Sequence, residues 1–404
     1  MLLCSLDDIE SGMVVVSPVL HPHRPDTTLL TAGAQLDGAI IARLRSLGVP
    51  QLWVHHDATA DLDAVVAPNL TEARLRVYSQ IKSDFQRMQG ATVCTAQVQR
   101  YRRAVMELIC ELMSRQGTAG LAEQLLGSGS SALFSHCANV CYLSLLAGLE
   151  LEPYVVRERS RVAVEDARDI TNLGLGAMLH DIGKVKLPKG LRDRHEIFFD
   201  DSDDDDELEQ EYRSHALIGF KMLRGSPLWA TSTQVVLCHH QRHNGSGWPE
   251  MDELTNNRRK GAQSQGGIHI FARIVAVANV LDNLMRSAEG DRRPPIAALC
   301  EMADRRFDGW FDPVIRSAMV RRLPPFPVAS QVRLSDGRLA VVVTPNFQQP
   351  CRPVVRLLSA SEKRPDGSFP LIDLEAVPEL EIIECAGMDV QRWLFELPPV
   401  RHVA

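Results

Sequence analysis

The sequence predicts a mainly α-helical protein with a small α/β unit at its N-terminal end and a small β-rich unit at its C-terminal end. Three observations predict this fold class: short apolar strands with turn signals near the start, helical spacing of apolar residues from about 120 to 325, and strand-like alternation from about 326. A chain of 404 residues is long enough for two or three domains. We expect four segments, with limits at 1–66, 67–118, 119–325 and 326–404.

Residues 1–66 are expected to form a small regulatory α/β unit. Strands are predicted at 13–19, 28–33 and 51–54, and a helix at 36–48 that ends at a C-cap glycine. The unit lacks the paired aspartates of a phosphorylation receiver, so we assign it no chemistry. The connecting segment 67–118 is polar, with apolar side chains three and four residues apart, which predicts a pair of helices over 69–116. These apolar side chains are Leu75, Tyr78, Ile81, Phe85 and Met88.

Two polar insertions interrupt the helical pattern of residues 119–325. The acidic run FFDDSDDDDELEQE (198–211) is too charged to form core and predicts a solvated surface loop. It lacks the glycine turn and spaced oxygen ligands of a calcium loop. The second insertion, NNRRKGAQSQGG (256–267), predicts another loop.

The C-terminal residues 326–404 show the alternation of β-strands. QVRLSDGRLAVVV alternates around Asp336-Gly337 and predicts a β-hairpin. The segments PVVRLLS and PLIDLEA are expected to extend it into a small sheet. No cluster of residues in this region suggests chemistry.

Composition excludes several classes of partner. The net charge of −7 provides no general attraction to DNA or to anionic membranes. No apolar run approaches the roughly 18–20 residues that span a bilayer, so membrane insertion is not expected. The nine cysteines include no CxxC pair, and the first residues, MLLCSLDDIESG, do not resemble a signal peptide. Both features favour a reduced, cytoplasmic setting.

Histidines recur at positions where a helix presents an apolar face. A single histidine of this kind is usually a hydrogen-bonded core residue. Several together, with an aspartate, would each cost about 1–3 kcal/mol if left buried without a partner. Helical bundles commonly place metal ligands inward from facing helices, and imidazole with carboxylate suits iron, manganese or zinc. We therefore predict a metal centre built from His136, His180, Asp181, His215, His239, His240 and Asn279.

Two strings among these residues carry a family resemblance. HDIGK (180–184) is the doublet of the HD phosphohydrolase superfamily, and HHQRHNGSGWP (239–249) resembles the signature HHExxDGxGYP. The order of the ligand histidines and these strings along the chain also matches the family, from His136 to the RRPP segment at 292–295. The chain thus resembles the HD-GYP family of metal-dependent phosphohydrolases, and this resemblance implies an HD-type helical bundle.

The resemblance also implies roles for individual residues. Two divalent ions are expected, iron or manganese in preference to zinc, with Asp181 bridging them. His136, His180 and Asn279 would hold one ion, and His215, His239 and His240 the other. Asp181 and Lys184 would be the catalytic residues, with Lys184 neutralising a phosphate oxygen. The alternative for Lys184 is an exposed lysine at a helix end.

Substrate contacts are expected outside the metal ligands as well. Arg292 and Arg293 correspond to an arginine-rich stretch that contacts ligand phosphates in the family, although a plain surface loop is an equally weighted alternative. Gly245, Gly247, Trp248 and Pro249 form the loop of the family signature, with Trp248 in place of tyrosine.

Three positions that are acidic in the family pattern carry amides here: Gln241, Asn244 and Asn279. A neutral amide at 279 would weaken binding of one ion. Ala132 stands where some members have a glutamate that supports a third ion, so a trinuclear centre is not expected.

Three functions follow from this pattern. The first is a phosphodiesterase that hydrolyses cyclic di-GMP, a bacterial second messenger, with metal-activated water. The second is a signalling receptor with a degenerate site that binds cyclic di-GMP without turnover. The third is a hydrolase of another nucleotide phosphate. Signalling proteins or a second copy of the chain are expected as partners.

Overall fold

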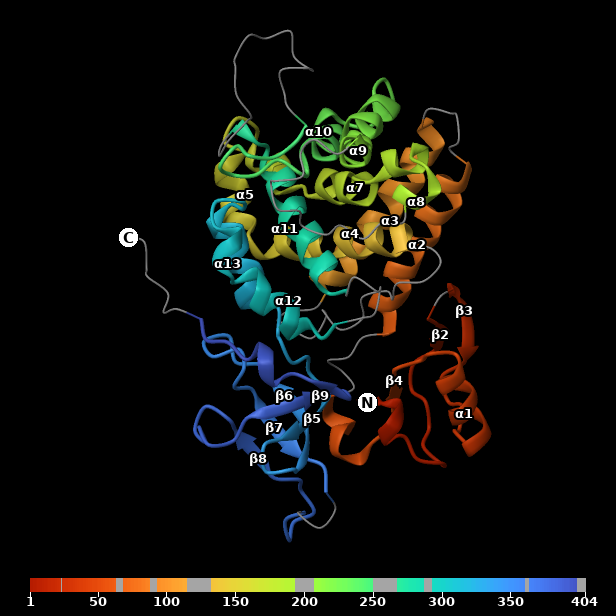
Figure 1. Ribbon diagram of the computed structural model, residues 1–404, viewed down its shortest axis with the longest axis vertical. Coiled ribbons are helices and arrows are strands. Elements are labelled where there is room, and N and C mark those ends of the chain that lie inside the picture. The colour runs from red at the N-terminus through yellow and green to blue at the C-terminus, as the bar shows by residue number, and fades with distance from the viewer. Residues whose placement is uncertain are drawn as a thin grey trace.

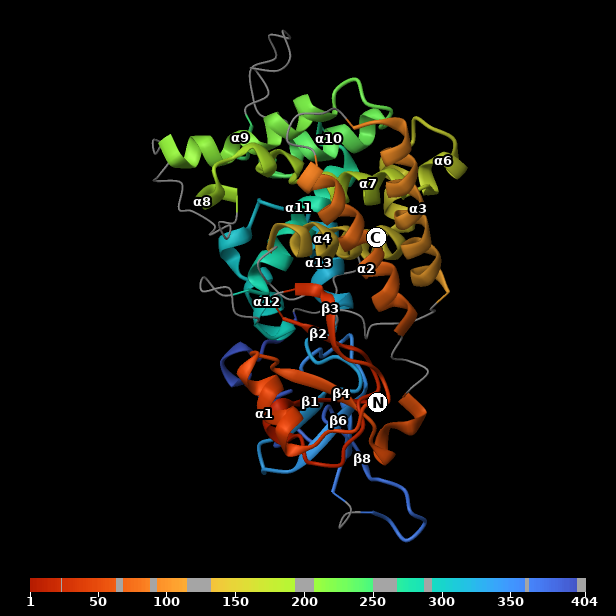
Figure 2. The same cartoon turned by 90° about the vertical axis from the view of Figure 1, so that its right-hand side faces the viewer.

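The computed structural model forms a large helical bundle with a smaller, β-containing body beneath it (Figure 1). The same two layers appear in the perpendicular view (Figure 2). The mainly α fold class with small units at both ends is therefore confirmed. The structure describes residues 1–22, 24–62, 68–87, 93–114, 132–192, 207–249, 267–286, 293–359 and 363–397.

Helix α4 (Ala132–Glu150) is the central helix of the bundle. It packs against α2 (Pro68–Arg87), α7 (Thr171–Leu179) and α11 (Ile270–Leu284). Because neighbours cover it on several sides, its residues are apolar around most of the circumference. By length and composition α4 could cross a membrane, which was not expected from the sequence, but 78% of its most apolar window is buried inside the protein.

The predicted connector helices belong to this bundle. Tyr78 and Ile81 of α2 and Leu108 of α3 (Thr95–Met113) are buried in the same apolar core as α4 and α7. The remaining helices of the bundle are α5 (Glu152–Glu158), α6 (Val164–Arg168), α8 (Lys189–Arg192), α9 (Glu207–Leu223), α10 (Ala230–Cys238), α12 (Pro295–Met302) and α13 (Pro313–Arg322).

Two helix boundaries near the predicted site differ from expectation. The string HALIGFKML by itself predicts a helix that opens at His215, yet α9 begins at Glu207 and places His215 in its interior. The string NLGLGAMLHDIGK predicts a helix that ends at Gly183, but α7 ends at Leu179, and Gly183 lies in the 3₁₀ turn η4 (Ile182–Lys186). The glycine is needed for packing, because a Cβ atom there would lie 1.9 Å from the carbonyl oxygen of His215.

The N-terminal unit contains two small antiparallel pairs. β1 (Leu2–Ser5) pairs with β4 (Gln51–Val54), and β2 (Val19–His21) pairs with β3 (Arg24–Leu30). The predicted helix is α1 (Gly38–Ser46), followed by Gly48 in the left-handed region at φ +73°. The strand predicted over 13–19 is wrong in extent. Strand β2 begins only at Val19, and before it Val14 and Val15 form isolated bridges.

The C-terminal unit is one antiparallel sheet in the order β10-β9-β5-β6-β7-β8. The predicted hairpin is confirmed as β5 and β6, with Gly337 in the turn at φ +88°. PVVRLLS and PLIDLEA contain β7 and β8, as expected, whereas the other two strands were not predicted. The bounds are β5 (Gln331–Leu334), β6 (Leu339–Thr344), β7 (Val354–Leu357), β8 (Leu371–Asp373), β9 (Ile382–Cys385) and β10 (Met388–Asp389).

The two end units pack together as one body. The backbone N–H of Leu3 donates to the carbonyl of Ala329 at 2.9 Å, and Leu3 forms a parallel bridge with Ser330. The Gln51 side chain donates to the carbonyl of Ala386 at 2.9 Å. Val341 of β6 is buried in the same apolar core as the N-terminal strands. Residues from both ends of the chain therefore share a core.

Candidate metal centre

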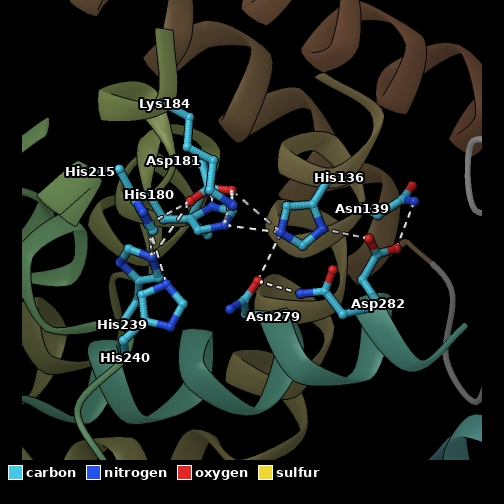
Figure 3. A network of polar contacts seen from close by, with 12 residues as sticks. His136, Asn139, His180, Asp181, Lys184, His215, His239, His240, Asn279 and Asp282 are labelled. Atoms are coloured by element: carbon cyan, nitrogen blue, oxygen red, sulfur yellow. Dashed lines mark hydrogen bonds and ion pairs between the residues drawn. The ribbon is translucent and has the colours of Figure 1, made fainter. Parts of the chain in front are cut away.

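Asp181 lies at the meeting point of imidazoles from four different helices or helix ends (Figure 3). Its Oδ1 is 3.1 Å from Nε2 of His215 and 3.7 Å from that of His239. Its Oδ2 is 3.4 Å from Nε2 of His180 and 3.7 Å from that of His136. Segments separated by up to about a hundred positions in the chain thus converge on one carboxylate.

These side chains form two groups of potential metal ligands. Within each group the ligand atoms all lie within 4.8 Å of one another, and Asp181 belongs to both. All members are buried except His240, which is partly exposed. The first group is His136, His180 and Asp181, and the second is Asp181, His215, His239 and His240.

The helix backbone fixes the orientation of three of these rings. Nδ1 of His180 lies 2.8 Å from the carbonyl oxygen of Ala177. Equivalent contacts join His215 to Tyr212 at 2.7 Å and His239 to Val236 at 2.9 Å. A carbonyl oxygen can only accept, so Nδ1 carries the proton in each ring and Nε2 of the neutral ring keeps its lone pair. That lone pair faces the centre, as a metal ligand requires.

The Nε2 atoms lie too close together for neutral rings with no cation between them. Those of His215 and His239, two rings that carry the proton on Nδ1, are 3.4 Å apart. Two lone pairs cannot form a hydrogen bond with each other. Protonation is not a solution, because burial lowers the pKa of His180 to about 3 and also lowers the pKa of His215. The donor set therefore fits divalent metal ions.

Lys184 is part of the centre and not an exposed helix-end lysine, so that alternative is wrong. Its side chain is 5% exposed, and its Nζ lies 2.7 Å from Oδ2 of Asp181 and 5.0 Å from the ring centre of Tyr212. Burial opposes ionisation of Asp181, but Lys184 and the surrounding imidazoles outweigh it and hold the pKa of this carboxyl well below its usual range.

Comparison with known proteins agrees with this geometry. A family model described as an HD domain matches residues 150–315, and one described as a KOW domain associated with the HD domain matches residues 331–387. A cyclic di-GMP phosphodiesterase of Pseudomonas aeruginosa is 27% identical over 366 residues, which cover 81% of this chain and 78% of that protein.

Two further relatives match shorter stretches of the chain. A cyclic di-GMP phosphodiesterase response regulator of Xanthomonas campestris pv. campestris is 32% identical over 145 residues, 35% of this chain and 32% of that protein. A cyclic di-GMP phosphodiesterase of Thermotoga maritima is 30% identical over 127 residues, 31% of this chain and 28% of that protein. The chain belongs to the HD-GYP family. The expectation from HDIGK and HHQRHNGSGWP is thus confirmed.

In this HD-GYP protein, His136 is held between two neighbours on α11. Its Nδ1 lies 2.6 Å from Oδ2 of Asp282, and its Nε2 lies 2.8 Å from Oδ1 of Asn279. Asn139 donates to the other Asp282 oxygen at 2.8 Å. Sequence reasoning assigned no role to Asp282, although its position three residues after Asn279 places both on one helix face. The carboxylate orients the ring.

The HD-GYP signature loop folds back onto the second ligand group. Trp248 stacks on His240, with ring centroids 3.7 Å apart and planes at 21°. Gly247 permits this, because a Cβ atom there would lie 2.2 Å from the carbonyl oxygen of His240. The Gln241 side chain donates to the carbonyl of Pro249 at 2.5 Å. The structure therefore gives Gly247 and Pro249 contacts that shape the loop.

Other residues singled out in the sequence lie elsewhere. Arg293 pairs with Glu301, donates to the carbonyl of Leu284 at 3.2 Å and lies over the Trp393 ring, so these contacts do not include the metal centre. Arg292 lies outside the described residues. Asn244 accepts from the backbone N–H of Ser246 at 3.0 Å, which stabilises the turn of the loop.

Proposed function

We propose that this chain is a metal-dependent phosphodiesterase that hydrolyses cyclic di-GMP to a linear dinucleotide or to GMP. The observation that carries the proposal is the sharing of buried Asp181 between two groups of ligands. Such a site can hold two divalent ions, and the resemblance to the family favours iron or manganese over zinc. The names of the relatives, all cyclic di-GMP phosphodiesterases, support this substrate.

The residues divide into two ligand sets around the shared carboxylate. His136, His180 and Asn279 would hold one ion, and His215, His239 and His240 the other. When bound, such ions supply a water molecule of lowered pKa and positive charge beside the phosphate. Asp181 contributes the one negative charge common to both sets.

The protein contributes orientation and charge around this position. The carbonyls of Ala177, Tyr212 and Val236 hold three rings in the tautomer that points Nε2 inward. Lys184 places a further positive charge next to Asp181, and this charge can stabilise negative charge on a phosphate oxygen. Burial of the ligands limits competing hydration and strengthens each electrostatic contact.

The test uses the full-length chain. Elemental analysis of the purified protein should find iron, manganese or zinc, approaching two equivalents per chain. Incubation with cyclic di-GMP and manganese or ferrous iron, followed by chromatography and mass spectrometry, should yield linear dinucleotide or GMP. The Asp181→Asn variant is the matched control and should lose both metal and turnover. Metal-poor protein that binds cyclic di-GMP without product would overturn the proposal in favour of a receptor.

A further inference from the structure

A pocket opens beside the metal centre, next to His239 and His240. Trp248 of the signature loop and Trp310, which precedes α13, contribute indole rings to its lining. Helix α9 contributes a phenol, a carboxylate and a guanidinium group. These are the side chains of Tyr212, Glu209 and Arg213.

Glu209 is the unexpected member of this lining. It belongs to the acidic run 198–211, for which a solvated loop was predicted. The described part of the run instead begins α9, and the Glu209 side chain is only 5% exposed. It accepts a hydrogen bond from Nε of Arg213 at 3.0 Å. A carboxylate in a buried position is costly unless charged or polar partners compensate it.

Helix geometry relates Glu209 to the metal centre. Glu209, Tyr212 and His215 are spaced three residues apart, so they follow one face of α9. Six residues of helix correspond to about 9 Å along the axis. His215 lies beside Asp181, whereas Glu209 lines the pocket. A ligand whose phosphate reaches the centre would therefore extend a different part of itself toward Glu209.

The chemistry of the pocket indicates which part that is. A carboxylate repels phosphate, so Glu209 itself is unsuited to contact the charged backbone of a nucleotide, and its pairing with Arg213 leaves both groups available for polar contacts with a base. Indole and phenol rings favour stacking with a nucleobase. The lining also contains a stacked cation, since the guanidinium carbon of Arg242 lies 3.4 Å from the centre of the Trp310 ring. An aromatic pocket with a few polar groups is typical of enzymes that bind a base by its edge.

We propose that this pocket is the base-binding subsite of the substrate and that Glu209 selects guanine. This inference rests on the proposed function and names the group that determines its specificity. An ionised carboxylate only accepts hydrogen bonds, and guanine presents two donors, N1–H and the 2-amino group, on one edge. Adenine presents an acceptor at N1, which the carboxylate would repel. Arg213 beside Glu209 can donate to the acceptors O6 and N7 of guanine.

The experiment measures binding of GMP and AMP to the manganese-loaded full-length chain by calorimetry. Monophosphates contain no phosphodiester bond, so turnover does not interfere. The unmodified chain should bind GMP at least roughly 10-fold more tightly than AMP. Glu209→Gln should reduce GMP affinity by roughly 10- to 100-fold and leave AMP nearly unchanged. The control Glu207→Gln changes an exposed acid on the same helix and should keep the preference.

The outcomes separate this inference from the proposed function. Equal affinity of the unmodified chain for GMP and AMP, or an unchanged preference in Glu209→Gln, would overturn the guanine subsite even if cyclic di-GMP is hydrolysed. A preference for GMP that depends on Glu209 would support the subsite even if no hydrolysis is found. Metal content of Glu209→Gln equal to that of the unmodified chain confirms that the variant folds. If that content falls, Trp310→Leu provides a second test and should weaken GMP and AMP binding alike.

Discussion

The ammonium group of Lys184 lies 2.7 Å from Oδ2 of Asp181, and both side chains are buried. Each charge compensates the other in an environment that water barely reaches. Loss of one partner therefore leaves an uncompensated buried charge, which is more costly than loss of both.

The first prediction concerns this pair in chelator-treated protein. Asp181→Asn should lower the free energy of unfolding by about 3–5 kcal/mol, because Lys184 loses its buried counter-ion. The double variant Asp181→Asn/Lys184→Met should recover most of that loss. Denaturant unfolding monitored by circular dichroism measures both. Equal stability of the single and double variants would show that Lys184 is not left with a costly uncompensated charge when Asp181 is replaced.

The second prediction concerns the contact between η4 and α9. Gly183→Ala should destabilise the protein by about 1–3 kcal/mol or more, because its Cβ would overlap the carbonyl oxygen of His215. Metal content should fall as well, since His215 must shift. Gly190→Ala is the matched control, because no atom lies within 4 Å of the Cβ position there. Similar melting temperatures for the two variants would contradict the packing argument.

The third prediction concerns the stacked ring on His240. Trp248→Ala should weaken metal binding several-fold, since an aromatic pair contributes about 0.5–1.5 kcal/mol. Trp248→Tyr retains a ring and should bind metal nearly as well as the unmodified chain. Trp229, whose surface is 65% exposed, serves as the control when changed to Ala. Competition with a metal-sensitive dye measures the affinities, and equal values for Trp248→Ala and Trp229→Ala would refute the role.

The fourth prediction concerns Asn279, whose amide lies 2.8 Å from His136. Asn279→Asp adds negative charge beside the first ligand group and should raise metal affinity there by roughly 10- to 100-fold. Elemental analysis after dialysis against limiting manganese measures the gain. An unchanged metal-to-protein ratio would indicate that residue 279 is not a ligand.

The fifth prediction concerns pH and a histidine outside the metal centre. His269 caps α11, and its Nδ1 accepts from the backbone N–H of Phe271 at 3.1 Å. Burial, followed by repulsion from Arg159 and Arg273, lowers the pKa of His269 from 6.5 to about 4. Between these values the unfolded chain binds a proton that the folded chain excludes. The contribution of His269 to the free energy of unfolding should therefore be fully present above pH 6.5 and be lost progressively as the pH falls toward 4.

Because of this one residue, the free energy of unfolding should change by up to about 1.4 kcal/mol per pH unit in this range. His269→Asn keeps a capping oxygen without titrating in this range. Chemical unfolding of both proteins between pH 4 and 7 measures the difference. Parallel stability curves would exclude His269 as the source.

Much of the centre could be predicted from the sequence because helices impose regular spacing. HDIGK and HHQRHNGSGWP carry ligands at helix ends, and each histidine follows an apolar stripe that marks a buried face. The bundle and the C-terminal hairpin followed from the same periodicities. The order of the strings along the chain also predicted which histidines belong together.

What could not be predicted depends on contacts between distant segments. Charge density made the run 198–211 appear solvated, yet the register of α9 turns Glu209 inward. Trp310 reaches the pocket from a segment that contains no recognisable motif. Arg293 matched a family position, but its pairing with Glu301 directs it elsewhere. In each case the neighbour that decides the orientation is not visible in the local sequence.

The backbone pairing of Leu3 with Ala329 and Ser330 has a topological consequence. The chain leaves the small body after its first strands and returns to it only after the helices, so the helical bundle is an insertion within a discontinuous unit. Truncation at either end of the chain would expose apolar core residues of the other end to solvent. A rotation of this unit would move both the segment that enters the helical bundle and the segment that leaves it.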